Sequence, residues 1–396
     1  MHIPSARVQN QMANEAAYLW FVPALGSDIH AILVKVPTNV IKSIVKGSPL
    51  EFAFGITEIE GIRYLAVAAR IHDDPVSPFI IIKAQRIAEE HNALFAILHR
   101  EETPIFFFDE LSRCVGWGHC AIEAAERQKA LEVIGDSKKL YVGNMNGACN
   151  AALDCFQLTI DPSTQIQGAK QIPAVFVSGK VKDISGIIIS AIGVGETHNY
   201  EITTTEEGGG QEVNAWHVLE SIFPLGIVKS PIVEEGAKER ELTDIFCYYE
   251  LGIFLVESKA LSIYIPESSR STERKIKVLH KHIRKALSQL KGALSSIRKG
   301  RIVKSLNGQT LEFNRNIPPH CIILVSELLQ FGEWDEIVDE CLALVPEFNA
   351  MIHILDVREL VALAAFSKSK EAFDYNLMER FRTFAQTKSP FIRGIP

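Results

Sequence analysis

Two short apolar runs separated by a turn constrain the fold of this chain more than any other part of its sequence. Residues 245–249 (Ile-Phe-Cys-Tyr-Tyr) and 253–256 (Ile-Phe-Leu-Val) are dominated by β-branched and aromatic side chains, which favour β-strands. Glu250-Leu251-Gly252 lies between them and supplies a turn. The stretch therefore predicts an antiparallel hairpin.

Charged side chains lie at the open ends of both predicted strands. Asp244 precedes the first strand, and Glu257 and Lys259 end the second, two residues apart and therefore on one face. A two-residue loop at Glu250-Leu251 would pair Asp244 with Glu257. The same loop one residue later would pair Asp244 with Lys259. A regular three-residue loop would place Asp244 opposite Ser258 and separate the groups, unless a bulge restored them.

Carboxylates and a lysine at one place suit the cleavage of phosphodiesters. Aspartate and glutamate supply the oxygen ligands that Mg²⁺ prefers, and lysine can stabilise the negative charge that develops on the reacting phosphate. The pattern resembles the core of the PD-(D/E)XK nuclease superfamily, the restriction-endonuclease-like fold. In this resemblance Asp244 is the motif aspartate, Glu257 the second acid and Lys259 the lysine, while Thr243 replaces a proline that is often present.

The resemblance implies a set of roles. Asp244, Glu257 and Lys259 would be catalytic, and the two acids would hold Mg²⁺, or Mn²⁺ in its place. The alternative is an ordinary hairpin whose charged ends lie at the surface.

A helix is predicted over residues 210–223, because apolar side chains recur at helical spacing from Val213 to Phe223. The superfamily fold begins with a helix before the hairpin, and this helix often carries one more acid towards the metal. Glu212, near the helix start, is the acid we favour for this catalytic role, and Glu220 is a candidate support residue. Either glutamate could equally be a solvated helix charge.

The most basic part of the chain follows the hairpin. Residues 270–304 combine many lysines and arginines with apolar side chains every three or four residues, in a chain of net charge −7. This pattern predicts a long amphipathic helix with one basic face. Beside the hairpin, such a face suits a nucleic-acid backbone; the alternative is a solvated helix face. Gln289 is a candidate support residue by resemblance. The expected nucleic-acid contacts are Lys277, Lys281, Arg284, Lys285, Lys291 and Arg298.

The remaining C-terminal residues fit a mixed sheet. Residues 321–326 form a continuous apolar run, as in a strand buried on both faces, and residues 351–355 predict another strand. Strands that alternate with helices predict an α/β domain with a mixed central sheet flanked by helices. The resemblance is close over about residues 210–330 and would make this domain restriction-endonuclease-like. Helices are expected over 335–344, 357–366 and 371–384.

The first half of the chain predicts an α+β region with no catalytic motif. The segment 203–210, rich in Thr, Glu and Gly, is the best linker candidate. We therefore expect an α+β recognition or interaction domain over 1–145, a connecting α/β segment over 146–206 and a nuclease-like domain over 207–396. Helices are expected over 83–91 and 146–156. Strands are expected over 18–22, 31–36, 51–56, 62–69, 79–82, 93–98, 105–108, 172–177 and 186–192.

Composition narrows the functional classes. A hydrophobic fraction of 47% and a charged fraction of 22% are typical of a globular protein. No apolar stretch is long enough to span a bilayer, and the polar start lacks a signal-peptide core, so we expect a cytoplasmic protein without a membrane partner. The lack of a glycine-rich phosphate loop argues against an ATPase or helicase. The seven cysteines, an odd number, fit small buried thiols in a reducing compartment better than a zinc site.

These expectations combine into a metal-dependent nuclease that hydrolyses phosphodiester bonds, as an endonuclease. The residues do not distinguish a DNA substrate from an RNA substrate, and we expect DNA. By analogy with similar nucleases, we expect a role in restriction or anti-phage defence. The protein would act as a homodimer or as a subunit of a defence complex. The alternative is a catalytically silent nuclease fold that serves as a nucleic-acid-binding or scaffold subunit.

Overall fold

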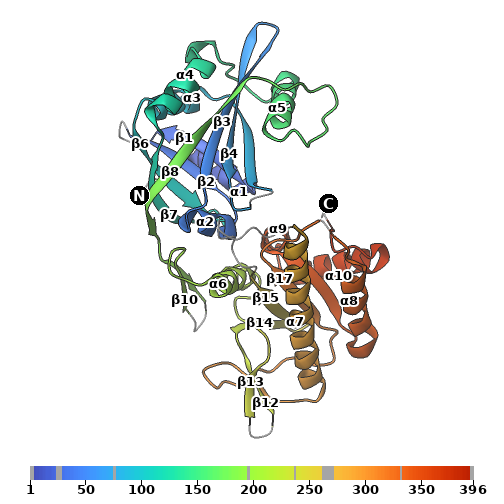
Figure 1. Ribbon diagram of the computed structural model, residues 1–396. Coiled ribbons are helices and arrows are strands. Elements are labelled where there is room, and N and C mark those ends of the chain that lie inside the picture. Colours follow the sequence, from blue (N-terminus) through green and yellow to red (C-terminus); the bar gives the residue numbers. More distant parts are fainter. Residues whose placement is uncertain are drawn as a thin grey trace. The chain divides into compact units, whose positions relative to one another are not determined.

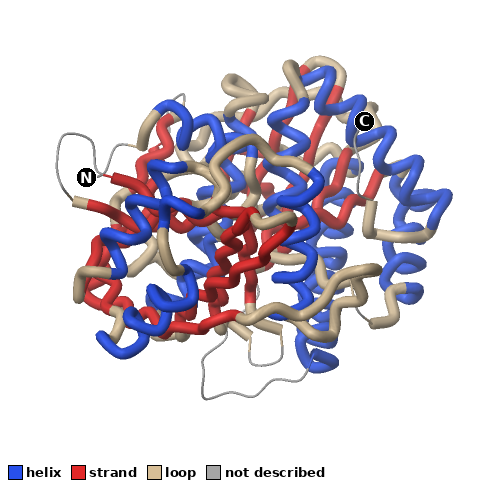
Figure 2. Tube along the Cα trace, turned by 90° about the horizontal axis from the view of Figure 1, so that it is seen from above, coloured by secondary structure: helices blue, strands red, loops and turns tan. Residues whose placement is uncertain are grey.

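The computed structural model describes residues 4–23, 29–74, 77–193, 197–235, 238–260, 272–330 and 332–392. The chain forms two compact units, which Figure 1 shows in the colours of the sequence. The first unit contains the chain up to Ile188 and the short segment Glu201–Thr204, and the second contains Ile189–Tyr200 and the described chain from Thr205 onward. Helices and strands are mixed throughout (Figure 2), and the protein is α/β.

The first unit is built on a mixed, mostly antiparallel sheet in the order β1-β2-β6-β7-β8-β3-β4-β5. Strands β2 and β6 run parallel. Its strands are β1 Tyr18–Pro23, β2 His30–Lys35, β3 Leu50–Ile59, β4 Ile62–Ile71, β5 Phe79–Gln85, β6 Glu102–Phe108, β7 Cys114–Ala121 and β8 Ala174–Gly186. Its helices are α1 Ala6–Asn14, α2 Thr38–Val45, α3 Ala88–Leu98, α4 Ala124–Ile134, the short 3-10 helix Ser137–Lys139 and α5 Gly147–Ile160.

Small residues allow α5 to pack closely on this sheet. Phe156 and Ile160 of α5 share a buried cluster with Ala53 and Ala68 of the neighbouring strands β3 and β4. At Gly55 a Cβ atom would lie 2.5 Å from the ring of Phe156, a distance that no side chain tolerates. Glycine and alanine at these positions therefore leave the space that the aromatic ring fills.

Several expectations for the first half differ from the structure. The helix expected over 83–91 starts only at Ala88, and residues 83–85 belong to strand β5. Residues 93–98, expected as a strand, belong to helix α3, whose Ala93, Leu94, Ile97 and Leu98 are buried at helical spacing. A short apolar run does not distinguish a buried strand from a buried helix. The segment 146–206 is not a separate connection, because α5 and β8 belong to the first unit, where β8 pairs with both β7 and β3.

The second unit is built on a five-stranded mixed sheet in the order β11-β14-β15-β17-β18. Its strands are β11 Ile227–Lys229, β14 Ile245–Tyr249, β15 Gly252–Lys259, β17 His320–Val325 and β18 Met351–Asp356. β11, β14 and β15 are antiparallel neighbours, while β15, β17 and β18 run parallel. Smaller sheets are formed by β9 Ile189–Ile192 with β10 Thr197–Tyr200, and by β12 Ile232–Glu235 with β13 Lys238–Glu241 and β16 Val303–Lys304.

The helices of this unit are close to those expected from the sequence. They are α6 Glu207–Glu220, α7 Thr272–Arg298, α8 Asp335–Phe348, α9 Val357–Phe366 and α10 Lys370–Thr387. Helix α6 begins at Glu207, so part of the expected linker over 203–210 is its first turn. All six residues of β17 are buried, which confirms the strand expected to be covered on both faces.

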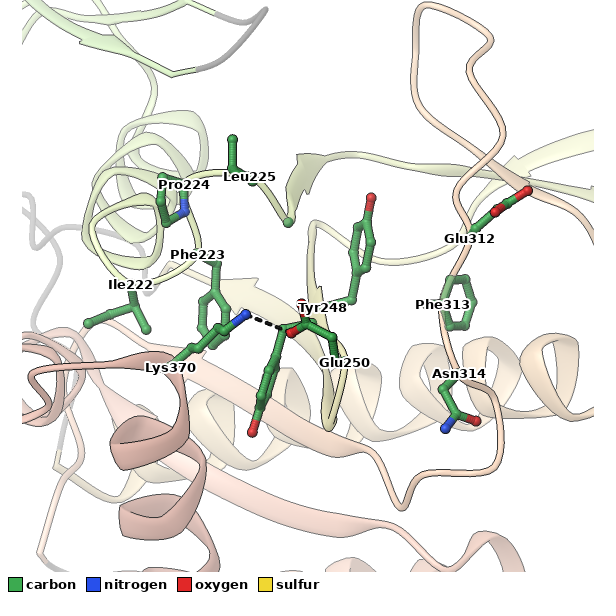
Figure 3. Close-up of a pocket in the computed structure, with 12 residues that line it drawn as sticks. Ile222, Phe223, Pro224, Leu225, Tyr248, Glu250, Glu312, Phe313, Asn314 and Lys370 are labelled. Carbon is green, nitrogen blue, oxygen red and sulfur yellow. Dashed lines mark hydrogen bonds and ion pairs between the residues drawn. The ribbon is translucent and has the colours of Figure 1, made fainter.

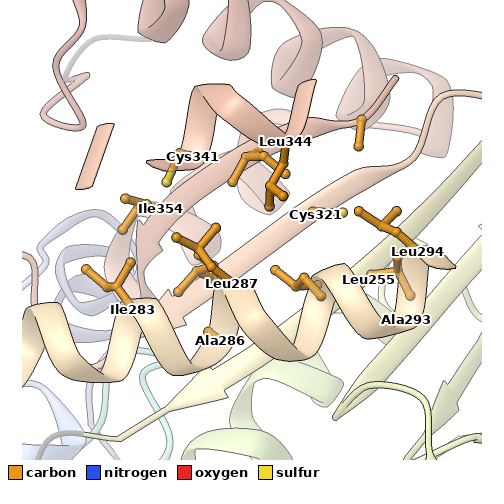
Figure 4. Close-up of a cluster of buried hydrophobic side chains, with 14 of the residues drawn as sticks. Leu255, Ile283, Ala286, Leu287, Ala293, Leu294, Cys321, Cys341, Leu344 and Ile354 are labelled. Atoms are coloured by element: carbon orange, nitrogen blue, oxygen red, sulfur yellow. The ribbon is translucent and has the colours of Figure 1, made fainter. Parts of the chain in front are cut away.

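The apolar stripe of α7 forms the core of the second unit. Ile283, Leu287 and Leu294 project from α7 towards the sheet, where they meet Leu255 of β15 and Cys321 of β17 (Figure 4). Helix α8 contributes to the same cluster. Because the apolar face of α7 is buried here, its polar face is directed away from the sheet, as the amphipathic pattern predicts.

A chain of buried polar groups fastens α10 to the sheet. His353 of β18 and His320 of β17 lie 3.0 Å apart through their ring nitrogens, and His320 lies 2.8 Å from the carboxylate of Asp374 on α10. The hydroxyl of Tyr249 donates to the other oxygen of Asp374 at 2.6 Å. Burial lowers the pKa of His353 well below its usual value, so this ring is neutral.

Candidate active site

The hairpin register brings the expected site residues to one edge of the sheet. Ile245 pairs with Val256 and Tyr249 with Gly252, which leaves Glu250-Leu251 as a two-residue turn. Of the three registers open from the sequence, this is the one that continues to place Asp244 opposite Glu257. Asp244 directly precedes β14, while Glu257 and Lys259 lie at the end of β15.

Lys259 joins the two carboxylates. Its Nζ lies 2.8 Å from Oε2 of Glu257 and 3.2 Å from Oδ2 of Asp244. The same oxygen of Asp244 accepts the backbone N–H of Ser258 at 2.6 Å. Thr243, the residue before Asp244, donates its hydroxyl to the carbonyl oxygen of Val256 at 2.8 Å. Side chains and backbone therefore hold the strand ends together.

Burial sets the electrostatics of the pair. The side chain of Glu257 is 1% exposed and that of Lys259 is 10% exposed. Burial and the charge of Asp244 raise the pKa of Glu257 to about 7, against the lowering effect of Lys259. Burial alone would lower the pKa of Lys259, but the charges of Glu257 and Asp244 outweigh it and raise the pKa. Lys259 is therefore positively charged, and Glu257 changes between its protonated and ionised forms near neutral pH.

Helix α6 supplies the additional acid. Burial raises the pKa of Glu212, and the charge of Asp244 raises it further, so the two carboxylates interact electrostatically. Glu212 forms an ion pair of 3.2 Å with Lys229, the last residue of β11. Glu220 lies at the opposite end of α6, where its side chain approaches Gly193. Glu212 is therefore the acid of α6 that interacts electrostatically with the hairpin.

A buried glutamine next to Glu212 fixes the helix to the sheet, and sequence reasoning did not find it. Nε2 of Gln211 donates to the hydroxyl of Ser258 at 3.0 Å and to the carbonyl oxygen of Leu324 at 3.1 Å. Its Oε1 accepts the hydroxyl of Ser326 at 2.6 Å. The only sequence signal was a polar residue within the predicted helix, which does not reveal whether it faces the core.

Substitution of Gln211 with alanine is expected to lower the free energy of unfolding by about 2 kcal/mol, because its buried partners are left without hydrogen bonds. Chemical denaturation of the two proteins measures this difference. Gln289→Ala is the matched control, since Gln289 is exposed and its side chain makes no hydrogen bond within the described chain. Equal effects of both substitutions would contradict the anchoring role of Gln211.

The basic face of α7 is divided between two environments. Arg284 forms ion pairs of 3.0 Å with Glu336 and 2.8 Å with Glu340, both on α8. Lys291 pairs with Glu347 of the same helix at 2.8 Å. These cations already have carboxylate partners on α8, while contact of the six basic residues with a nucleic acid stays a prediction.

The remaining cations of α7 differ in their surroundings. Arg298 also turns to α8, where it donates to a backbone carbonyl oxygen. Lys277, Lys281 and Lys285 are exposed and form no ion pair among the described residues. Burial lowers the pKa of His282, and the charges of Lys285 and of the site lysine lower it further. The unpaired side of α7 therefore lies within electrostatic reach of the candidate site.

The carboxylates are suited to a hard divalent cation. Asp244 and Glu257 offer oxygen donors in a buried setting. Burial and the charge of Asp244 raise the pKa of Glu257, and a bound cation would oppose this increase. Within the described residues, no group of three or more His, Cys, Asp or Glu side chains is arranged to hold a metal. The cysteines are free thiols. A metal would therefore rest on the two hairpin acids and would need further ligands, such as water.

A cavity of about 580 Å³ lies at the other end of β14, away from the site. Figure 3 shows Pro224 and Leu225 on one side and Tyr248 and Phe313 on the other. A Cβ at Gly226 would lie 2.0 Å from the carbonyl oxygen of Tyr248, so the turn before β11 can pack here only with glycine. The cavity contains none of the expected site residues.

No protein-family model, curated protein or solved structure matches this chain. Within the part of the chain that the structure describes, no helix is long and apolar enough to cross a membrane. The interpretation of the site therefore rests on its residues and their geometry.

Proposed function

We propose that the second unit is a metal-dependent nuclease that hydrolyses phosphodiester bonds, with DNA as substrate. The observation that carries the proposal is the hairpin register, which brings Asp244 and Glu257 to N···O distances of 3.2 Å or less from Lys259. In a surface hairpin with incidental charges we would not expect a buried glutamate and lysine, because burial of charged groups is unfavourable unless they are paired or serve a function.

The surrounding elements support a restriction-endonuclease-like fold. The resemblance implies a helix before the hairpin, a mixed sheet and a helix after the lysine. Helix α6, the five-stranded sheet and α7 occupy these places. Glu212 on α6 adds the acid that this fold often carries towards the metal.

Each side chain has a role in the proposed reaction. Asp244 and Glu257 would hold Mg²⁺ or Mn²⁺, which supplies Lewis acidity and lowers the pKa of a bound water. Lys259 carries a positive charge beside both acids and would stabilise negative charge on the reacting phosphate. Glu212 would complete the acidic surroundings from α6.

Incubation of the purified protein with supercoiled plasmid and Mg²⁺, with and without a chelator, tests this function. Nicked or linear plasmid that forms only with free metal is the expected result. A single-stranded RNA of the same length in a parallel reaction shows whether DNA is preferred. No cleavage of either polymer with Mg²⁺ or Mn²⁺ would contradict the proposal.

Metal affinity is expected to rise between pH 6 and pH 8. Glu257 has a pKa of about 7, so at lower pH it is mostly protonated and a poor ligand, while at higher pH it is a carboxylate. Calorimetric titration with Mn²⁺ at several pH values measures the affinity and the protons released. A flat profile over this range would show that Glu257 does not bind the metal.

The unpaired lysines of α7 are expected to contact the polyanion. Replacement of Lys281 and Lys285 with alanine should weaken DNA binding and reduce the slope of log affinity against log salt by about 1 for each phosphate that is no longer neutralised. Fluorescence anisotropy over a salt series, with a chelator present to prevent cleavage, measures both quantities. Arg284→Ala is the control, because Arg284 is held by α8. An equal effect of the control would refute this division of the helix.

A catalytically silent nucleic-acid-binding or scaffold subunit is the second candidate. The observation in its favour is that Lys259 already forms ion pairs with both carboxylates, which stabilises the hairpin without any metal. This candidate predicts salt-dependent DNA binding, if it binds at all, without metal-dependent cleavage or Mn²⁺ uptake.

A further inference from the structure

Ser258 lies between the acid and the lysine at the end of β15 but faces the other side of the sheet. Side chains alternate along a strand, so Glu257 and Lys259 share the face of Leu255, which packs in the α7 cluster. Ser258 faces α6 instead, where its hydroxyl accepts a hydrogen bond from Nε2 of Gln211 at 3.0 Å. Helix α6 thus holds, from one face, the residue that separates the two site residues on the opposite face.

The backbone of Ser258 contacts the candidate site directly. The regular pairing of β15 with β14 ends at Val256, and two side chains of the segment before β14 continue it. The hydroxyl of Thr243 donates to the carbonyl oxygen of Val256. Oδ2 of Asp244 accepts the N–H of Ser258 at 2.6 Å. Because the same oxygen accepts Nζ of Lys259 at 3.2 Å, the N–H of Ser258 orients a carboxylate that belongs to the site.

Gln211 is therefore linked to Asp244 through a single residue. Gln211 and Ser258 are 7% and 6% exposed, so water does not readily replace the hydrogen bond between them. The amide of Gln211 is itself fixed, because it also donates to the carbonyl oxygen of Leu324 in β17 and accepts the hydroxyl of Ser326. Ser258 is the partner of Leu324 in the parallel pairing of β15 with β17. The glutamine thus holds the ends of two neighbouring strands in fixed positions.

We propose that Gln211 is a positioning residue, which holds Ser258 from the α6 face so that its N–H fixes the carboxylate of Asp244 for the reaction. The inference rests on the proposed nuclease function and adds a residue that supports its site without contact to metal or DNA. Without Gln211, the end of β15 loses its partner on α6, and the carboxylate of Asp244 loses its fixed orientation. The lysines of α7 are not involved, so the affinity for DNA does not depend on Gln211.

Cleavage rates of full-length variants test this role. Gln211→Ala and Ser258→Ala should each lower the rate at saturating DNA about tenfold, the lower end of the usual effect of residues that orient site ligands. Their DNA affinity, measured by fluorescence anisotropy with a chelator, should equal that of the wild type. The double variant should be no slower than either single one, because both residues act through the same hydrogen bond.

Ser326→Ala is the matched control for a general loss of stability. It removes another hydrogen-bond partner of Gln211 but leaves the contact with Ser258, so it should keep most of the wild-type rate. Ser258→Thr retains both the hydroxyl and the N–H and should restore the rate lost in Ser258→Ala. Circular dichroism at the assay temperature shows whether each variant is folded. If Gln211→Ala does not fold, Ser258→Ala, which removes only one hydroxyl, decides the question.

Hydrogen exchange of the Ser258 amide gives a second measurement that does not depend on cleavage. Nuclear magnetic resonance of the serine-labelled protein should show exchange about tenfold faster in Gln211→Ala, since the strand end has lost a buried partner, and little change in Ser326→Ala. Equal slowing of cleavage in Ser326→Ala and Gln211→Ala, or a wild-type rate in folded Gln211→Ala, would overturn the inference. If the wild type cleaves no nucleic acid, the proposed function fails, and unchanged exchange in Gln211→Ala would overturn the inference separately.

Discussion

Replacing Lys259 with methionine is expected to reduce plasmid cleavage by about 100- to 1,000-fold, the usual cost of removing a group that stabilises transition-state charge. Methionine approaches the length of lysine without its charge, so the effect isolates the ammonium group. It should appear as a lower rate at saturating DNA, because the lysines of α7 that are proposed to bind phosphate are untouched. Initial rates of supercoil disappearance at fixed Mg²⁺ give the comparison.

Two further variants make this result interpretable. Lys259→Arg keeps the positive charge but not the compact ammonium, and it should retain the fold with part of the rate. Lys388→Met removes an exposed lysine at the C-terminal end of α10, paired with Asp339, and should be as active as wild type. Because Lys259→Met removes the cation that pairs with two buried acids, circular dichroism must first show that the variant is folded. A folded Lys259→Met protein with wild-type rates would contradict the proposed mechanism.

Phe254→Ala is expected to lower the free energy of unfolding by about 3–5 kcal/mol, as for other fully buried phenylalanines. Phe254 is 0% exposed in the middle of β15. Its ring centroid lies 4.8 Å from that of Phe223, 5.1 Å from that of His320 and 5.9 Å from that of Phe373. Removal of the ring would open a cavity between the sheet, the turn after α6 and helix α10.

Urea denaturation measures the stability of this variant. Phe366→Ala is the matched control, because Phe366 ends α9 with 65% of its surface exposed. Its substitution should change the stability by less than about 0.5 kcal/mol, as is usual for surface positions. Similar destabilisation of both variants would contradict the stabilising role of the aromatic cluster around Phe254.

The helices of the second unit and its strands β14, β15, β17 and β18 could be predicted because local patterns and tertiary packing agree there, whereas the short strands β10, β11, β12, β13 and β16 were not predicted. The apolar positions of α7 recur at helical spacing, and Ile283, Leu287 and Leu294 are all buried. In the first unit this agreement is weaker. Residues 93–98 have an apolar run without clear periodicity and form a helix, and β7 with its glycines gave no strand signal. Strand β8 pairs with β3, which is far away in sequence, and no local sequence pattern predicts such a pairing.

The candidate site could be predicted only in part for a similar reason. Asp244, Glu257 and Lys259 lie within one hairpin, so their convergence depends on a single turn. Gln211 reaches the hairpin from α6, and its position follows from packing rather than from spacing. The division of the α7 cations was also hidden, because the carboxylates of α8 that pair with Arg284 are more than 50 residues away.

The second unit carries different charges on the surfaces of its helices α7 and α8. Helix α8 contains Asp335, Glu336, Asp339, Glu340 and Glu347 and no lysine or arginine, whereas Lys281 and Lys285 on the neighbouring α7 are unpaired among the described residues. Four of the five acids already have a cation partner, so the field that attracts a polyanion comes mainly from the unpaired lysines of α7. A long negatively charged molecule would therefore be oriented before it touches the protein, and added salt would slow the encounter more than it would speed departure.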